Sequence, residues 1–257
     1  MSARSDDLRR PRPPRSADDW ALFLDVDGCL LDFADAPDAV TVPHSLRHTL
    51  STLARRLHGA VALVSGRSLS SIDALFAPLQ LPASGLHGVE QRSSQRHLPA
   101  PLPPQALHAI REEAGQIVLA YPGALVEDKG AALGLHWRAA PQAAEALRAF
   151  ADVALPRLPG YRLQHGDSVV ELRPASTDKG SAILSLLDEA PFRGRLPVFI
   201  GDDLTDESGF AVVNAKGGLS VLVGQREPSA AHYGLADPGA VRRWLAEIAD
   251  QREEATR

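Results

Sequence analysis

Short apolar runs alternate with amphipathic segments along most of the chain. The runs at residues 21–24, 60–64 and 197–200 have the length and composition of buried strands. The segments that follow carry leucine or isoleucine at spacings of three and four residues, as in Leu46 and Leu50, which predicts amphipathic helices. Strands that alternate with helices are typical of a parallel sheet with right-handed crossovers. We therefore expect an α/β fold with a Rossmann-like parallel-sheet core.

Local signals place some of these elements more closely. Ser68 is a typical N-cap, and Asp237 followed by Pro238 is a typical helix start, so helices are predicted to begin at both positions. Residues 84–92 are predicted to form one further short strand, with polar side chains near its end.

The pattern changes after a proline-rich segment. Residues 98–105 contain four prolines, which favour a stiff, extended junction. The elements predicted beyond it are a helix at 105–119, strands at 125–129 and 133–138, a helix at 142–153, and strands at 161–164 and 168–172. This order is typical of an α+β layer. We therefore expect a core domain formed by residues 20–102 and 173–257, interrupted by an inserted α+β cap domain at 103–172.

Composition adds few constraints. The chain has 257 residues, 44% of them hydrophobic, and a net charge of −5, which does not favour nucleic-acid binding. No apolar run is long enough to span a membrane and no signal peptide is recognisable, so we expect a cytoplasmic protein without a membrane partner. Residues 1–19 are rich in arginine, aspartate and proline and are expected to form a disordered tail. A monomer is expected, although the sequence leaves the oligomeric state open.

Polar residues follow the predicted strands, at the edge of the sheet where sites form in open α/β folds. Asp25 and Asp27 come directly after the first strand and are two residues apart, so they point to the same side of an extended chain. The residues brought to the same edge by the other strand ends and by one helix start are Ser65, Arg67, Lys179, Asp202, Asp203 and Asp206.

This set of residue types suits phosphate chemistry. Clustered carboxylates favour Mg²⁺, and serine and lysine supply donors for phosphoryl oxygens. The sequence contains no P-loop, no dinucleotide-binding glycine motif and no nucleophile-elbow motif. An aspartate can itself attack phosphorus and form an aspartyl-phosphate. Asp25 fits this role, and Asp27 fits the proton donor that later activates water. The only cysteine, Cys29, excludes an internal disulfide and a cysteine-based zinc site.

These residues resemble the haloacid dehalogenase superfamily of phosphotransferases. The matching motifs, in the order of that superfamily, are DVDGC at 25–29, VSGR at 64–67, DKG at 178–180 and GDDLTDE at 201–207. The longer stretches SGRSLSSIDALF, GLHGVE, VEDKGAALGLHWR and VVELRP resemble, more closely, the bacterial trehalose-6-phosphate phosphatases. Cys29 departs from the superfamily, which usually has threonine or serine at that position.

The resemblance implies a role for each matching residue. Asp25 would be the nucleophile and Asp27 the acid and base, while Ser65 and Lys179 would hold the phosphoryl group. Mg²⁺ would be held by Asp25, the backbone carbonyl of Asp27 and Asp202, with either Asp203 or Asp206 assisting. The residues implied to bind the sugar are Arg67, His87 and Glu90 of the core and Lys129, Arg138 and Glu171 of the cap.

We therefore expect a Mg²⁺-dependent phosphatase that converts trehalose 6-phosphate to trehalose and phosphate. A related capped phosphatase, acting on sucrose phosphate or mannosylglycerate phosphate, is the nearest alternative. A phospho-receiver and a sugar-phosphate sensor without activity are alternatives from another class. Receivers are about half this length, and the intact pair of Asp25 and Asp27 disfavours a sensor.

Overall fold

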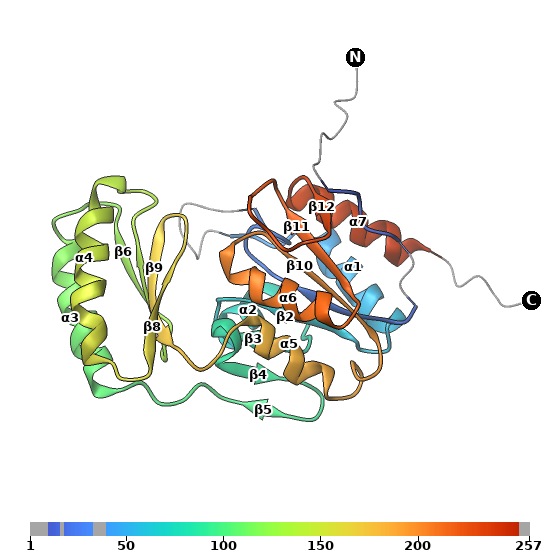
Figure 1. Ribbon diagram of the computed structural model, residues 1–257, viewed down its shortest axis with the longest axis horizontal. Helices are drawn as coiled ribbons and strands as arrows, with labels where there is room; N and C mark the ends of the chain where they lie inside the picture. The colour runs from blue at the N-terminus through green and yellow to red at the C-terminus, as the bar shows by residue number, and fades with distance from the viewer. Residues whose placement is uncertain (1–9, 16–17, 33–39, 252–257) are drawn as a thin grey trace, which may run out of the picture.

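Two separate sheets divide the chain, as Figure 1 shows. The computed structural model describes residues 10–15, 18–32 and 40–251. One sheet has eight strands in the order β12-β11-β10-β1-β2-β3-β4-β5, and the other has four in the order β6-β7-β9-β8. The mixed α/β fold with a largely parallel sheet, interrupted by an inserted α+β layer, confirms the predicted fold class.

The eight-stranded sheet is parallel from β12 to β3 and gains two antiparallel strands at the other edge. Its strands are β1 (Trp20–Leu24), β2 (Val61–Val64), β3 (Ala83–Gly85), β4 (Glu90–Arg92), β5 (His97–Leu98), β10 (Leu196–Gly201), β11 (Leu219–Val223) and β12 (Tyr233–Leu235). All five residues of β1 are buried, as expected for a central strand covered on both faces.

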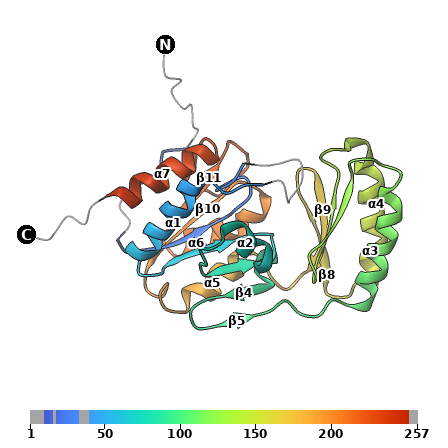
Figure 2. The same cartoon turned by 180° about the vertical axis from the view of Figure 1, so that it is seen from behind.

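Helices cover both faces of this sheet. They are α1 (His44–Arg56), α2 (Leu69–Phe76), α5 (Lys179–Leu187), α6 (Glu207–Ala215) and α7 (Pro238–Asp250). Helices α1 and α7 pack together on one face, and α5 and α6 pack together on the other (Figures 1 and 2). The predicted caps are confirmed, because the Ser68 side chain accepts from Ser71 N and the Asp237 side chain from Ala240 N.

The four-stranded sheet is antiparallel throughout. Its elements are α3 (Gln105–Val118), β6 (Leu125–Asp128), β7 (Leu133–His136), α4 (Ala144–Ala154), β8 (Tyr161–His165) and β9 (Val169–Pro174). Helices α3 and α4 lie on the side of this sheet that faces away from the core, as both Figure 1 and Figure 2 show. Buried residues such as Val170 and Leu172 pack in a hydrophobic cluster with these helices, while Glu171 alternates to the opposite face, toward the core.

Each sheet has a hydrophobic cluster of its own, which supports the proposed division into core and cap. Strand β9 continues to Pro174, two residues beyond the proposed junction at 172 and 173. Within the described ranges, the helices are too short or too polar to span a bilayer.

The prediction of one strand at 84–92 is wrong. Two antiparallel strands, β3 and β4, form there, joined by a tight turn at Leu86–Gly88. Leu86 and His87 both have left-handed backbone conformations, with φ of 50° and 54°. Residues other than glycine rarely adopt a left-handed backbone conformation. The pattern of hydrophobic and polar side chains therefore does not predict a turn at these positions. Strands β5 and β12 were not predicted either.

The prediction of a disordered tail over residues 1–19 is wrong for residues 10–15. Arg10 Nε donates to the Ala231 carbonyl at 2.8 Å, and Trp244 Nε1 donates to the Pro14 carbonyl at 3.1 Å. Gly234 N also donates to the Pro11 carbonyl at 3.0 Å. The segment is placed by polar contacts to the sheet edge and to α7, which an argument from apolar burial overlooks. Residues 1–9 and 16–17 lie outside the described residues.

Candidate active site

A cavity lies between the carboxyl ends of the core strands and the open face of the cap sheet. The core contributes residues that directly follow β1, β2 and β10, and the cap contributes side chains from β6, β7, β8 and β9. Of the residues proposed from the sequence, those that line it are Asp25, Asp27, Ser65, Arg67, His87, Lys129, Arg138, Glu171, Lys179, Asp202 and Asp203. Residues far apart in the sequence therefore share one cavity.

Lys179 joins two carboxylates at the floor of the core. Its Nζ lies 2.9 Å from Asp25 Oδ1 and 2.7 Å from Asp206 Oδ1. All three side chains are buried, with relative exposures of 3% for Lys179, 4% for Asp25 and 0% for Asp206. Burial disfavours the ammonium, but the carboxylates of Asp206 and Asp25 outweigh it and raise the pKa of Lys179 well above its ordinary value. Lys179 is therefore a permanent cation beside the proposed nucleophile.

The same floor contains more negative than positive charge. Asp25, Asp202, Asp203 and Asp206 surround the single ammonium of Lys179. Burial, together with the neighbouring Asp206 and Asp203, raises the pKa of Asp202 to about 7. Burial likewise raises the pKa of Asp25, and Lys179 only partly opposes it. A cation bound between these carboxylates would remove the repulsion.

Donor atoms for such a cation converge at one point. Carboxylate oxygens of Asp25 and Asp202 and the sulfur of Cys29 lie within 4.8 Å of one another. The Asp202 carboxylate lies over Gly28, where a Cβ would come within 2.2 Å of Asp202 Oδ2. The two aspartates suit Mg²⁺, which prefers oxygen ligands. The Cys29 thiol does not, because burial and Asp202 raise its pKa and keep it protonated. The residues present thus fit a hard cation held by Asp25 and Asp202.

Asp206 organises the loop that carries Asp202. Its Oδ2 accepts from the backbone N–H groups of Asp202, at 2.9 Å, and Asp203, at 3.0 Å. Its other oxygen, Oδ1, accepts from Lys179, so both carboxylate oxygens of Asp206 are used in contacts within the protein. Of the two assistants that the sequence left open, only Asp203 lines the cavity.

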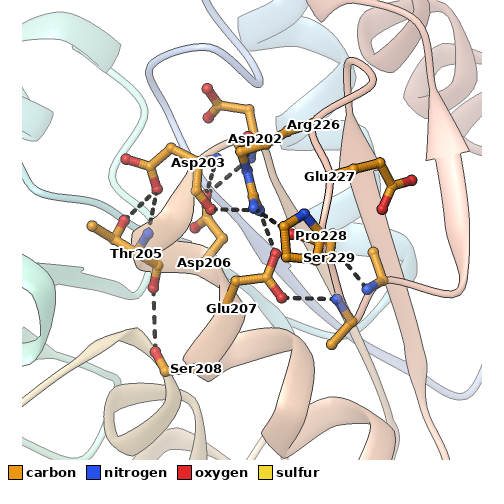
Figure 3. A network of polar contacts seen from close by, with 12 residues as sticks. Asp202, Asp203, Thr205, Asp206, Glu207, Ser208, Arg226, Glu227, Pro228 and Ser229 are labelled. Carbon is orange, nitrogen blue, oxygen red and sulfur yellow. Dashed lines mark hydrogen bonds and ion pairs between the residues drawn. The ribbon is translucent and has the colours of Figure 1, made fainter. Parts of the chain in front are cut away.

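Arg226, in the loop after β11, supports the same segment from behind (Figure 3). Its guanidinium donates to the backbone carbonyls of Asp202, at 3.3 Å, and Asp203, at 3.0 Å. Glu207 pairs with this guanidinium and also accepts from Ala230 N at 2.8 Å. The acidic loop is therefore fixed by side chains that do not enter the cavity.

Asp27 is held by Arg67. Nε and Nη2 of Arg67 donate to Oδ2 and Oδ1 of Asp27 at 2.7 and 2.8 Å, a bidentate arrangement of high geometric specificity. Arg67 was expected to bind sugar. In this structure its guanidinium pairs with the carboxylate of Asp27, the residue proposed to transfer protons. Ser65, buried at the end of β2, accepts from Arg67 N at 3.1 Å and lines the same cavity.

The cap presents a compact group of charges to the core. Lys129 Nζ pairs with Glu171 Oε1 and lies 3.5 Å from Glu127 Oε2. It also donates to the carbonyl of Gly66 at 3.1 Å, which links cap to core. His87 Nε2 lies 3.2 Å from Glu171 Oε2, a second link between the domains. The cap in this structure is therefore joined to the core by polar contacts around the cavity.

Glu90, which was proposed to bind the sugar, is not among the residues that line the cavity. Its Oε1 accepts from the backbone N of Leu69, at the start of α2. Glu90 therefore serves the turn that follows β2. Arg138 lines the cavity at its exposed rim, 3.6 Å from Asp167.

Two further residues of the cavity wall, Glu127 and His136, were not predicted from the sequence. Glu127 lies two positions before Lys129 and shares its face of the cap sheet, where it pairs with His136 at 2.8 Å. The alternation of side chains along a strand could have identified Glu127. No sequence signal links Glu127 to His136, because that contact depends on the pairing of β6 with β7.

Comparisons with known proteins agree with this geometry. The trehalose-phosphatase family matches residues 23–239. A trehalose-6-phosphate phosphatase of Escherichia coli is 43% identical over 237 residues, covering 91% of this chain and 88% of the relative. A probable trehalose-phosphate phosphatase of Sinorhizobium fredii is 41% identical over 251 residues, covering 97% and 91%. The C-terminal domain of a C. albicans trehalose-6-phosphate phosphatase has the same fold, with a TM-score of 0.81 at 20% identity over 95% of this chain and 99% of that one.

Proposed function

The chain belongs to the trehalose-phosphatase family and is a phosphoric monoester hydrolase, and from this premise we propose that it hydrolyses trehalose 6-phosphate to trehalose and phosphate. One observation carries the proposal. The cavity places the buried pair of Asp25 and Lys179 opposite a cap surface in which Lys129 lies between Glu127 and Glu171. The first group suits a phosphoryl group and the second suits the hydroxyls of a sugar.

Phosphoryl transfer would begin at Asp25, whose carboxylate attacks phosphorus to form an aspartyl-phosphate. Lys179 and the hydroxyl of Ser65 would donate to the phosphoryl oxygens. Mg²⁺, held by the carboxylates of Asp25 and Asp202 and by the backbone carbonyl of Asp27, would neutralise charge on the phosphate when bound. The convergence of donor atoms from Asp25 and Asp202 supports this assignment.

Asp27 would protonate the departing sugar oxygen and then accept a proton from the attacking water. Both of its oxygens accept from Arg67 in this structure. Asp27 can therefore deliver a proton only after this ion pair has opened. We propose that the arriving substrate competes for Arg67 and so releases Asp27 at the right moment.

Sugar recognition would fall to the cap. Glu127 and Glu171 both pair with Lys129, so hydroxyls can replace part of this network without leaving a charge unpaired. The links from Lys129 to Gly66 and from His87 to Glu171 would hold the cap closed and exclude bulk water. The proposal includes a monomeric enzyme in the cytoplasm.

Phosphate release from a substrate panel tests the function. Trehalose 6-phosphate, sucrose phosphate, mannosylglycerate phosphate and a small ester such as p-nitrophenyl phosphate would be compared, with Mg²⁺ and with a chelator. We expect kcat/KM for trehalose 6-phosphate to exceed that of every other ester by about 100-fold, and activity to disappear with chelator and return with Mg²⁺. Equal rates on the small ester would refute the sugar specificity, and full activity in chelator would refute the metal.

A further inference from the structure

A second, smaller cavity lies beside the first, between the cap strands β8 and β9 and the helix starts of the core. The residues that line it are His87, Arg162, Gln164, Arg173, Asp178, Lys179, Leu204, Thr205 and Ser208. Four of them, His87, Gln164, Lys179 and Thr205, also line the larger cavity. The two cavities therefore share a wall, which includes the lysine proposed to hold the phosphoryl group.

Two arginines face each other across the strands that cover this cavity. Arg162 of β8 is the register partner of Arg173 of β9, so the two side chains lie on the same face of the sheet. Like charges at directly opposite positions destabilise a sheet. Within the described part of the chain, neither arginine forms an ion pair with a carboxylate. Their hydrogen bonds go to backbone carbonyls, from Arg173 Nη2 to Thr177 at 2.7 Å and to His87 at 3.2 Å, and from Arg162 Nη2 to Thr177 at 3.4 Å.

Polar atoms around these arginines are buried without partners. Nε of Arg162, Nε of Arg173, Nδ1 of His87 and Oγ1 of Thr177 find no hydrogen-bond partner among the described residues. Arg173 is only 1% exposed, so bulk water has almost no access to it. A buried donor without a partner destabilises the folded protein, and more so when it is charged. Nδ1 of the neutral His87 is an acceptor, because its Nε2 donates to Glu171. The other three atoms are donors, and they indicate an acceptor that the described part of the chain does not provide.

Nearby acids do not supply that acceptor. The Asp178 carboxylate accepts from Ser181 N, at 2.7 Å, as the N-cap of α5. Glu171 is shared between Lys129 and His87. Burial and the adjacent Arg162 lower the pKa of Arg173 to about 10, as expected where positive charge is in excess.

We propose that Arg162 and Arg173, together with Thr177, form a second binding site for a small tetrahedral oxyanion, separate from the phosphoryl site at Asp25. Guanidinium groups match the oxygens of such an ion in a fork geometry. Inorganic phosphate is the occupant we assign, because Lys179 borders both cavities and the product of the proposed reaction is released beside it. That source rests on the proposed function, whereas the site itself does not.

Occupancy of this site would act on the position of the cap. Arg162 and Arg173 lie on the strands of the cap sheet, and Thr177 belongs to the core. An anion bound to both parts favours the arrangement in which they are close together. Phosphate would thereby slow opening of the cap, in addition to any competition with substrate at Asp25.

The test is a calorimetric titration of inorganic phosphate into the full-length protein, both with Mg²⁺ and with a chelator. Phosphate bound at Asp25 requires the metal, whereas the second site contains none of the proposed ligands. We expect one saturable site to persist in chelator, with an affinity at least tenfold weaker in Arg162→Gln. The matched control is Arg157→Gln, which removes the same charge from the cap but pairs with Glu113 away from both cavities. It should bind as the wild type does.

Several outcomes would overturn the proposal. These are loss of all phosphate binding in chelator, unchanged binding by Arg162→Gln, and displacement of phosphate by acetate as readily as by sulfate. Should Arg162→Gln fail to fold, crystals of the wild type soaked in selenate give the answer by anomalous scattering. A peak between Arg162 and Arg173 supports the site, and a peak beside Lys179 and Ser65 alone refutes it. Because none of these measurements uses turnover, they are independent of whether trehalose 6-phosphate is the substrate.

Discussion

The two walls of the large cavity are built on different principles. The core wall consists of residues that come directly after parallel strands, such as Asp25 after β1 and Ser65 after β2. The cap wall consists of side chains from the strands of an antiparallel sheet, such as Glu127 on β6 and Glu171 on β9. The first arrangement places reactive groups at a sheet edge, where backbone and loops can approach the ligand. The second offers a patterned surface that suits recognition.

Their electrostatics differ as well. In the core wall four carboxylates share one ammonium, so this wall has an excess of negative charge that a bound cation would balance. In the cap wall Glu127 and Glu171 both pair with Lys129, and Glu127 also contacts His136, so each carboxylate has a partner within the wall. The core should therefore govern chemistry and metal binding, while the cap should govern which ester is accepted. The following experiments separate the two walls.

Replacing the nucleophile should have the largest effect. Asp25→Asn keeps the shape of the side chain but removes its charge, and we expect turnover to fall by at least about 10³-fold. Binding of the sugar by the cap should be retained, since the cap contacts are untouched. Steady-state phosphate release and calorimetric binding of trehalose 6-phosphate would measure the two effects. Turnover near the wild-type rate would show that Asp25 is not the attacking group.

Replacing the central cap lysine should change specificity more than chemistry. Lys129→Met leaves Glu127 and Glu171 without their shared cation, and we expect kcat/KM for trehalose 6-phosphate to fall by about 100-fold. Hydrolysis of p-nitrophenyl phosphate, which does not reach the cap, should change less than about threefold by the same reasoning. The control is Lys216→Met, an exposed lysine after α6. Equal losses on both esters would place Lys129 in the chemical step.

His87 contacts Glu171 across the two walls. The pH dependence of the free energy of unfolding tests this contact. Burial lowers the pKa of His87 from 6.5 to about 4, although Glu171 opposes this shift. Between these values the unfolded chain takes up a proton that the folded protein does not, so stability is full above pH 6.5 and is lost as the pH falls toward 4. From pH 7 to pH 5 the wild type should lose about 2 kcal/mol through this group.

His87→Asn should remove that part of the pH dependence, which urea unfolding at the two pH values would measure. Asparagine tolerates the left-handed backbone of His87. The matched control is His58→Asn, because His58 is exposed and has a similar φ of 52°; its pH dependence should stay that of the wild type. An identical slope in all three proteins would contradict a neutral, buried His87.

Arg226 should give the smallest effect, because it acts on the core wall only through the backbone of Asp202 and Asp203. In Arg226→Gln we expect the Mg²⁺ concentration for half-maximal activity to rise by about tenfold, with kcat at saturating Mg²⁺ nearly unchanged. A titration of activity against Mg²⁺ would measure this split. A fall in kcat that Mg²⁺ does not restore would indicate damage to the fold instead of loosened positioning.

Periodicity and chain order were enough to predict the alternation of strands and helices, the proline-marked start of the inserted layer and the residues that follow each core strand. Asp25, Ser65 and Asp202 could be assigned to one place because the carboxyl ends of parallel strands lie at one edge of a sheet. That rule depends on local periodicity and chain order alone. The prediction failed at the left-handed turn of Leu86 and His87, where the side chains follow no regular hydrophobic pattern.

The pairing of individual side chains could not be predicted in this way, because it depends on how the folded elements pack together. In the folded protein Arg67 pairs with Asp27 and Glu90 accepts from the backbone N of Leu69. Arg162 lies opposite Arg173. Each of these contacts joins elements separated by ten to forty residues, and its distance depends on how sheets and turns pack. Periodicity fixes the face on which a side chain lies, but a hydrogen bond or an ion pair requires the partner within about 3 Å. Only the packing of the folded protein brings the two partners that close together.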